Sequence, residues 1–533
     1  MAKGYRPVDR DQVFLLPPDM REWLPAGHPV WVVIEALGRM DTSAFHAGRK
    51  TGGAGAAGYD PDMLVAVLVW AYAHRITSSR RMEELCRTDV AFRVICGGNL
   101  PDHSTLARFR KESGGAVAGF FTEVLVLCAR LGMGRLGMVA LDGMKIAASA
   151  SKAANRGEDK LRELAERAVA AHAAADAAED ELFGDARGDE VPEDAWSPRR
   201  RAGRIAEALA QLEAERQAAQ AAADAKAEEF RERQRAGQRT GPPPAGAAVA
   251  LAEENLARVT AARQAELDEL EKRYAAGQPR RGRGAGVEDH CRVRQAAAKA
   301  EKARARAAEA ERKAAAKAGP GPVRNITGPD SRLMPTRNGF IQGYNTQNVT
   351  SQDGLVIATE LTADPADMAW WEPMMEQAAA AAALIGANRP PGPAPDGDPD
   401  GGGIGLALAD AGYCSEANLT CDGPDRLIAV GKRRDLEKGA RGQDTGQDRG
   451  GEATARMRAR LKTGDGITAY RQRGHIAETP HGHIKHNMGF RQLSVRGKPA
   501  AAAGWTFACA VRNLAKALTT GHLTPAALAS LAG

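Results

Sequence analysis

The first quarter of the chain carries apolar segments of helical length, each preceded by a residue that can cap a helix. The run DMLVAVLVWAYAHR is long and apolar, SSRRMEELCRTDVAFRVI begins on serine, and DHSTLARFRKE offers Asp102 and Ser104 as caps. Short polar side chains at these positions accept hydrogen bonds from the first backbone amides of a helix. The pattern therefore predicts an all-α N-terminal domain over residues 1–135.

The pattern changes near residue 152, where alanine, glutamate, arginine, lysine and glutamine replace most other residue types. In RIAEALAQLEAERQ and LAEENLARVTAARQAELDELEKRYAA, leucines recur three and four residues apart, which is the spacing of an amphipathic helix. The prolines of GQRTGPPPAG separate two such helices. We predict a long helical or coiled insertion over residues 152–321, folded as a hairpin; disorder in part of EKARARAAEAERKAAAKAGPGP is the alternative.

Strand patterns flank this insertion on both sides. After it, GFIQGYNTQNV and GLVIATELT read as two antiparallel strands, because Asp353-Gly354 between them is a hairpin signal. A helix, a further apolar strand and the strand RLIAVGK follow. We expect one α/β domain over residues 136–151 and 322–518, followed by a C-terminal tail over residues 519–533.

Two of the predicted strands end on an aspartate. MVAL precedes Asp142, and GIGLALA precedes Asp410. Carboxylates at the ends of strands face a crevice, and their hard oxygen atoms select Mg²⁺ or Mn²⁺ over softer metals. Such a site needs a third acid, and Glu478 is the best candidate because it lies within a strongly basic stretch.

Charge and cysteine content narrow the class of protein. The whole chain of 533 residues has a formal charge of only +6, but residues 451–500 hold ten Lys or Arg against three acids, which is the footprint of a polyanion partner. Seven cysteines without CxxC pairs indicate a reducing compartment. Neither a signal peptide nor a run of eighteen apolar residues is present, so we expect a cytoplasmic protein without a membrane partner.

Two short motifs match known sites only in part. GMGRLG has the letters of the dinucleotide fingerprint, but a predicted helix precedes it and a strand follows, which is the reverse of the required order. DGDPDGGG begins like a calcium loop, yet Ala407 occupies the position that needs a bidentate glutamate. We interpret the first as a helix end with a loop and the second as a solvated linker.

The chain resembles the DDE transposases of bacterial insertion sequences. The segments that carry the resemblance are SSRRMEELCRTDVAFRVICGGNLPDHSTLARFRK, VALDGMKIAASAS, GPDSRLMPTRNGFIQGYNTQ, LADAGYCS and ETPHGHIKHNMGFRQLSVRG. This resemblance implies a ribonuclease-H-like α/β core with a mixed sheet, joined to the all-α N-terminal domain and interrupted by the helical insertion. It also implies that Asp142, Asp410 and Glu478 are the catalytic and metal-binding residues.

Within this family the resemblance is to the branch with a Tyr-Arg-Glu-Lys signature. Tyr470, Arg473, Glu478 and Lys485 fit it, except that one extra residue separates the arginine from the glutamate, which leaves Arg471 as a fallback. Tyr470, Arg473 and Lys485 would then contact DNA near the scissile phosphate. Near the N-terminus, Arg108, Arg110 and Lys111 on the last predicted helix are further candidates for binding DNA.

The implied reaction is metal-dependent cleavage and transfer of DNA strands, with two Mg²⁺ or Mn²⁺ ions held by the three acids. The implied partners are double-stranded DNA, as inverted-repeat ends and as target, and a second copy of the chain in the active complex. The implied location is the bacterial cytoplasm, in association with the nucleoid.

Two other classes of function stay open. The cluster His475, His481, His483 and His486 could bind zinc, as in a zinc hydrolase, although this leaves both aspartates unexplained. Alternatively, the chain could be a domesticated DNA-binding protein that no longer catalyses transposition.

Overall fold

The computed structural model describes residues 5–6, 8–10, 19–49, 57–167, 198–236, 244, 247–279, 286–317, 322–336, 338–392, 398, 403–431 and 450–531. The chain divides into two compact units. One unit comprises Met1–Ala154 and Thr327–Gly533, and the other comprises Asn155–Ile326. The predicted insertion thus overlaps most of the second unit, whereas no boundary between units falls at residue 135.

A six-stranded mixed sheet forms the centre of the first unit. Its strands are β3 (Met138–Ala147), β6 (Arg332–Thr336), β7 (Gly339–Ser351), β8 (Val356–Thr362), β9 (Leu406–Ala409) and β10 (Asp425–Ile428). Their order is β10-β9-β3-β7-β6, and β8 also pairs with β7. Strands β3, β9 and β10 are parallel to one another, and β7 is antiparallel to β3, β6 and β8. This arrangement is compatible with a ribonuclease-H-like core.

Asp142 lies inside β3, so the expectation that this strand ends on the aspartate is wrong. The strand continues because the long strand β7 pairs with it from Val139 to Ala147. The parallel partner β9 is shorter, and its pairing with β3 ends where Leu141 lies opposite Ala409. Asp142 on β3 and Asp410 after β9 are therefore the first residues beyond the segment over which these two parallel strands pair with each other.

The N-terminal part of the chain is helical apart from one short strand pair. Its helices are α1 (Pro29–Leu37), α2 (Ser43–His46), α3 (Pro61–Ala73), α4 (Ser79–Thr88), α5 (Val90–Cys96), α6 (His103–Glu112) and α7 (Val117–Arg130). Strand β1 (Tyr5–Arg6) pairs with β2 (Gly58–Tyr59). Asp102 caps α6 by accepting from the Thr105 amide, as predicted, whereas Asp89 divides the segment after Ser78 into two helices.

These helices share one hydrophobic core with the sheet. Helix α7 packs against α12 (Trp371–Asn388) and α18 (Lys498–Thr519), and both of these pack against β8. On α18, the Asn513 side chain donates to the Val356 carbonyl and accepts from the Val356 amide, which fixes this helix to the strand.

The helical run His103–Arg130 is long and apolar enough to cross a membrane by length and composition alone. Its apolar residues on α7 lie in the shared core.

A second, smaller core covers the sheet beside Asp142 and Asp410. It consists of Ala140, Leu408, Leu427, Met457, Leu461, Ile476 and Ala477. The last four come from α15 (Glu452–Leu461) and from a π-helical turn, η6 (Gly474–Glu478). This turn belongs to one helical run that also contains α16 (Gly464–Arg473), α17 (Thr479–Gly482) and a second π-turn, η7 (His483–Asn487). The remaining helices of the unit include α13 (Glu416–Thr420) and α19 (Pro525–Ser530).

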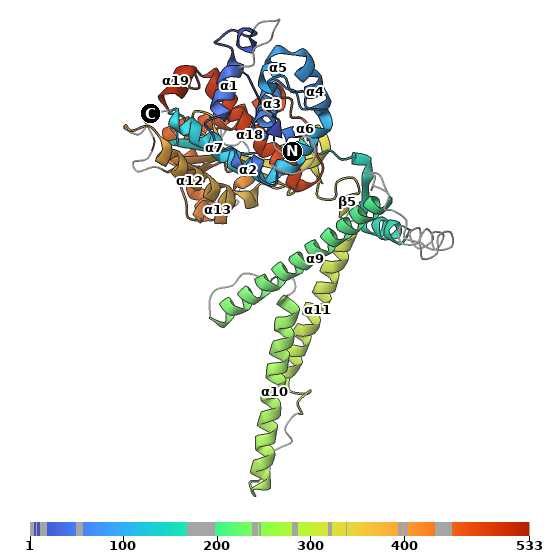
Figure 1. Ribbon diagram of the computed structural model, residues 1–533. Helices are drawn as coiled ribbons and strands as arrows, with labels where there is room; N and C mark the ends of the chain where they lie inside the picture. Colours follow the sequence, from blue (N-terminus) through green and yellow to red (C-terminus); the bar gives the residue numbers. More distant parts are fainter. Residues whose placement is uncertain are drawn as a thin grey trace, which may run out of the picture. The chain divides into compact units, whose positions relative to one another are not determined.

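The second unit contains three long helices in its described part, where the sequence predicted a two-helix hairpin. They are α9 (Pro198–Arg235), α10 (Ala247–Ala275) and α11 (Cys291–Lys317). Helices α10 and α11 pack side by side (Figure 1). Most of GQRTGPPPAG and residues 318–321 lie outside the described residues. The segment for which partial disorder was the alternative is helical up to Lys317.

A two-stranded sheet closes the second unit. Strand β4 (Asn155–Gly157) pairs antiparallel with β5 (Val323–Asn325), which brings the two ends of the unit together. A small core of Leu161, Ile205, Ala208, Leu212 and Ile326 lies in the same unit. None of its described residues contributes a strand to the six-stranded sheet.

The two partial motifs have structural roles. GMGRLG lies between the end of α7 and the start of β3, as expected, and Gly134 adopts a positive φ of 95° there. In the segment interpreted as a solvated linker, Asp398 is instead buried: its side chain is 2% exposed, pairs with Arg389 and accepts from the amides of Leu136 and Gly137. Asp396, Gly397 and residues 399–402 of that segment lie outside the described residues.

Replacement of Asn155–Ile326 by a short Gly-Ser linker is expected to leave the first unit folded. The flanking residues already lie close together, because the Ser151 amide donates to the Thr327 hydroxyl over 2.9 Å. The shortened chain should lose far-UV circular dichroism from the three long helices but keep one cooperative thermal transition. An aggregated chain without such a transition would contradict the division into independent units.

Candidate active site

The three predicted acids lie around one arginine. Nη2 of Arg473 is 2.7 Å from Oδ1 of Asp142 and 3.7 Å from Oδ2 of Asp410. Its Nη1 is 3.9 Å from Oε1 of Glu478. Asp142 comes from β3, Asp410 follows β9, and Arg473 and Glu478 come from the helical run that the second core holds against these strands. Residues more than 300 positions apart in the sequence thus meet at one point.

The extra residue between Arg473 and Glu478 is accommodated by the π-turn. An α-helix brings residues four apart onto one face, whereas a π-helix, with hydrogen bonds between residues five apart, does the same for that spacing. Because Gly474–Glu478 is π-helical, Arg473 and Glu478 approach each other although they are five residues apart. Arg471, the fallback from the sequence, is exposed. The geometry therefore favours Arg473.

The two aspartates differ in environment. Burial opposes ionisation of Asp142, but the adjacent His481 imidazole and Arg473 guanidinium outweigh it, and its pKa lies below the usual value. Burial raises the pKa of Asp410, and the negative charges of Asp142 and Asp367 add to this effect against the opposing charge of Arg473. The site thus holds more negative charge than its one arginine compensates, which favours a further cation.

Asp367 is a fourth acid near the site, and the sequence reading missed it. Its Oδ1 accepts from Asn345 at 2.7 Å and from Gln347 at 2.8 Å, and Lys145 lies 3.2 Å away. A Cβ on Gly143 would stand only 2.5 Å from this oxygen, so the glycine after Asp142 makes room for Asp367. The available signal was its position directly after the strand GLVIATELT, in the turn ADPAD.

The acids supply the oxygen donors that a hard divalent cation prefers, although Asp142, Asp410 and Glu478 do not bring ligand atoms within 4.8 Å of one another as a group of three. Carboxylate oxygens are the ligands that Mg²⁺ and Mn²⁺ prefer, and Asp142, Asp410 and Glu478 all turn an oxygen toward the same positive charge. Arg473 itself now contacts these oxygens, so it and a metal ion compete for them. Asp142 and Asp410 could hold an ion, while Glu478, whose side chain is 70% exposed, stands at the edge of the site. Asp465, another acid of the basic stretch, is exposed.

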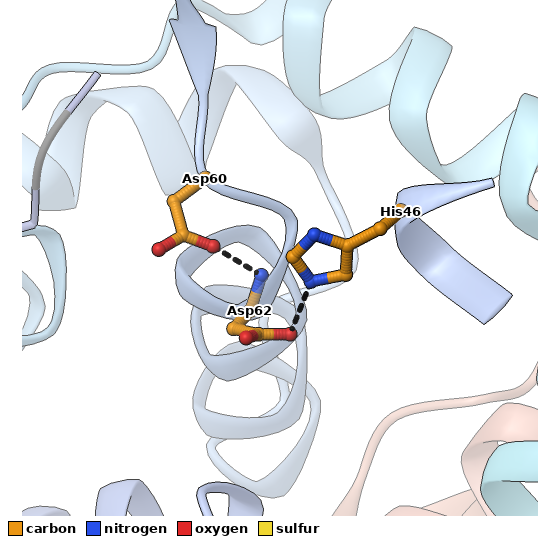
Figure 2. A group of neighbouring side chains, drawn as sticks. All are labelled: His46, Asp60 and Asp62. Atoms are coloured by element: carbon orange, nitrogen blue, oxygen red, sulfur yellow. Dashed lines mark hydrogen bonds and ion pairs between the residues drawn. The ribbon is translucent and has the colours of Figure 1, made fainter. Parts of the chain in front are cut away.

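Another group of potential ligands lies among the N-terminal helices. His46, Asp60 and Asp62 have ligand atoms within 4.8 Å of one another, and among the described residues this is the one such group of three (Figure 2). Asp60 caps α3 by accepting from the Asp62 amide, and His46 hydrogen-bonds to the Asp62 carboxylate at 3.0 Å. The positive end of a helix dipole repels cations, so we interpret this group as a helix cap.

The histidine cluster does not form a zinc site. His475, His481, His483 and His486 all lie on the helical run, yet no three of them come within ligand distance of one another. His475 and His486 are exposed, whereas His481 is buried and its Nδ1 lies 3.5 Å from Oδ2 of Asp142.

The candidate DNA contacts fall into two groups. Tyr470 donates its hydroxyl to the carbonyl of Ala409, so it holds the end of β9 next to Asp410, and Lys485 is half-buried on η7. On α6, Arg108 and Lys111 are exposed.

Arg110, also predicted to bind DNA, instead donates to the Thr77 carbonyl and the Ser79 hydroxyl, each at 2.9 Å. Its guanidinium is thus engaged in joining α6 to the segment before α4. Contact between Arg110 and DNA stays a prediction, and it would require these hydrogen bonds to be exchanged for a phosphate.

Two family models match the chain. Residues 18–112 match the Transposase domain (DUF772), and residues 438–518 match the Transposase DDE domain. No curated protein and no solved structure matches it. The second match contains Tyr470, Arg473, Glu478 and Lys485.

A helix-covered mixed sheet with acids at neighbouring strands, together with these matches, defines a transposase. The two matches support a DDE transposase of the insertion-sequence type. Proteins of this class process DNA and generally depend on divalent metals, so DNA is its partner.

Substitution of Arg473 by Met is expected to destabilise the first unit at neutral pH. Asp142 and Arg473 are only 15% and 14% exposed, and removal of one partner of such a pair costs about 3 kcal/mol or more. Without the guanidinium the pKa of Asp142 rises, so the loss should shrink as the pH falls and the carboxyl binds a proton. Thermal melts at pH 7.5 and 5.5 measure both effects. The exposed Arg471, changed to Met, is the control, and equal losses in the two variants would contradict the role of Arg473.

Proposed function

We propose that this transposase binds the terminal inverted repeats of its insertion sequence and catalyses metal-dependent cleavage and transfer of DNA strands on a ribonuclease-H-like core. The observation that carries the proposal is the meeting of Asp142, Asp410 and Glu478 around Arg473. Acids drawn from separate elements into one partly buried cluster are costly for stability, and such clusters are typical of sites with a chemical task.

Asp142 and Asp410 are the proposed principal metal ligands, with Glu478 completing the set. Two bound Mg²⁺ or Mn²⁺ ions would activate the attacking hydroxyl and stabilise the departing oxygen at the phosphorus. Strand β3 supplies a rigid base for Asp142, because it is paired on both sides up to Leu141 and with β7 beyond. Tyr470 fixes the backbone before Asp410. Rigid support of this kind keeps ligands in place during the reaction.

Arg473 would exchange its partners when DNA binds. Its guanidinium is always charged and presents five donors, and phosphate is a partner as suitable as carboxylate. Within the described part of the chain its Nε has no hydrogen-bond partner, so one donor is already free. Movement of the other donors from Asp142 and Asp410 to a phosphate would expose these carboxylates to metal.

The basic stretch around the site supplies the wider DNA surface in this proposal. Lys485 contacts a phosphate near the scissile bond, and Arg108 and Lys111 on α6 contact the repeat or the target elsewhere. Two copies of the chain would hold the two inverted repeats, in the cytoplasm close to the nucleoid.

An inactive, domesticated DNA-binding protein is the second candidate. A chain that no longer catalyses the reaction has no need to keep acids together around the largely buried Asp142, because like charges held close to one another cost stability. The complete set of three acids therefore favours the active enzyme. No three of the four histidines approach one another, which argues against the zinc hydrolase.

The proposal is tested with DNA that carries the ends of the element. Asp142→Asn and Glu478→Gln should abolish metal-dependent nicking and strand transfer, because each removes a metal ligand, while binding to the DNA persists. The exposed Asp465, changed to Asn, is the matched control and should keep full activity. Full nicking by Asp142→Asn would contradict the DDE mechanism.

Salt titrations separate binding from catalysis. Lys485→Ala should weaken DNA binding and reduce the slope of log affinity against log salt by about one unit, because one phosphate contact is lost. Lys302→Ala, on the exposed surface of α11, is the control and should leave both unchanged. An unchanged slope for Lys485→Ala would show that this lysine does not contact a phosphate.

A further inference from the structure

His481 is a buried imidazole beside the first acid. Its side chain is 7% exposed, and in the described part of the chain neither ring nitrogen makes a hydrogen bond of good geometry, although Nδ1 lies near the Asp142 carboxylate. Buried polar atoms nearly always have partners, so this pair of nitrogens calls for an explanation. The nearest charged group is Asp142, whose Oδ2 lies 3.5 Å from Nδ1 of His481.

We infer that His481 is a nitrogen ligand of the metal ion bound by Asp142, and that it shifts the preference of the site from Mg²⁺ toward Mn²⁺. This inference rests on the proposed function, because it concerns the same metal site. It adds a residue that is not among the three acids.

The distance between the two side chains suits two ligands of one ion. Metal–ligand bonds of about 2.1 Å place neighbouring ligand atoms about 3 to 3.5 Å apart. The separation of 3.5 Å between Nδ1 and Oδ2 is at the upper end of this range and too long for a good hydrogen bond. Oδ1, the other oxygen of Asp142, is taken by Arg473, so Oδ2 and Nδ1 are the pair left to a metal.

The surroundings hold the ring in this orientation. His481 lies on α17, between the two π-turns, and its ring centroid is 6.4 Å from that of the fully buried Trp505. The indole of Trp505 is itself fixed, because its Nε1 donates to Thr359. The imidazole therefore cannot turn out to solvent without opening the core, which keeps the cost of ordering this ligand low.

The neighbouring histidines do not share this geometry. His483 is half-buried, and its pKa is lowered by burial and by the positive charges of Arg512 and Lys516, on a different side of the helical run. His475 and His486 are exposed. His481 is thus the histidine of the cluster that contacts one of the three acids.

A nitrogen donor changes which metal the site prefers. Mg²⁺ is bound by oxygen ligands and water, whereas imidazole binds transition ions more strongly. His481 should therefore increase the preference of the site for Mn²⁺ over Mg²⁺ beyond that of a site with carboxylates alone.

Titration of the full chain with Mn²⁺, followed by electron paramagnetic resonance, tests this assignment. Bound Mn²⁺ should show ¹⁴N modulation in the electron spin echo, and His481→Phe should remove it. The same substitution should weaken Mn²⁺ binding about tenfold or more, as expected for loss of a metal-site residue, while Mg²⁺ binding measured by competition changes much less. His475→Phe, an exposed histidine from the same run, should keep both the modulation and the affinity.

The assignment is overturned if bound Mn²⁺ shows no ¹⁴N modulation or if the modulation survives in His481→Phe. It is also overturned if Mn²⁺ and Mg²⁺ binding fall equally, because His481 would then only pair with Asp142. If His481→Phe does not fold by circular dichroism, His481→Gln, which is smaller and keeps a polar group, takes its place in the same measurements.

Failure of this inference can be distinguished from failure of the proposed function. Cleavage that depends on Asp142, with an unchanged preference between metals in the His481 variant, overturns only the role of His481. Retention of metal binding and of cleavage by Asp142→Asn overturns the metal site itself.

Discussion

The contact between Arg473 and Asp142 is the interaction on which the active-site region depends. Asp142 is largely buried on β3, where an uncompensated charge is too costly to keep. The guanidinium compensates it and reaches Asp410 and Glu478 as well. One cation thus joins two neighbouring strands of the sheet to a helical run from the far end of the chain. If the Arg473 guanidinium is removed by mutation or moves to a DNA phosphate, the acids around it need another positive charge.

This contact is possible because the helical run has a fixed position on the sheet. Ile476 and Ala477 pack with Ala140 and Leu408, which lie two residues before Asp142 and Asp410 on their strands. The same apolar contacts therefore set the distance between the acids and Arg473. The π-turn has poorer hydrogen bonds than an α-helix, and such turns are found frequently at functional sites. Here it aligns Arg473 with Glu478 across a spacing of five residues.

The helices of the second unit are stabilised differently from those of the first. These long helices bury few apolar side chains, and surface ion pairs such as Arg233 with Glu229 and Lys313 with Glu309 lie along them. Pairs of this kind contribute little each, so strong helix formers are the main reason that the helices form. The antiparallel pair β4 and β5 begins and ends the unit, and the chain can therefore leave the first unit and return to it at neighbouring points.

The sequence by itself determined most of the local elements and singled out the candidate acids. Apolar periodicity, caps and the Asp353-Gly354 turn predicted most helices and strands, because these signals act over a few residues. Family resemblance selected Asp142, Asp410 and Glu478. Contacts between distant segments decided other features. Strand β3 extends past Asp142 because it pairs with the long strand β7, and the Arg110 side chain donates to a backbone carbonyl more than 30 residues away. Asp367 and His481 gained their places beside the acids in the same way, since contacts between distant segments leave no periodic mark in the sequence.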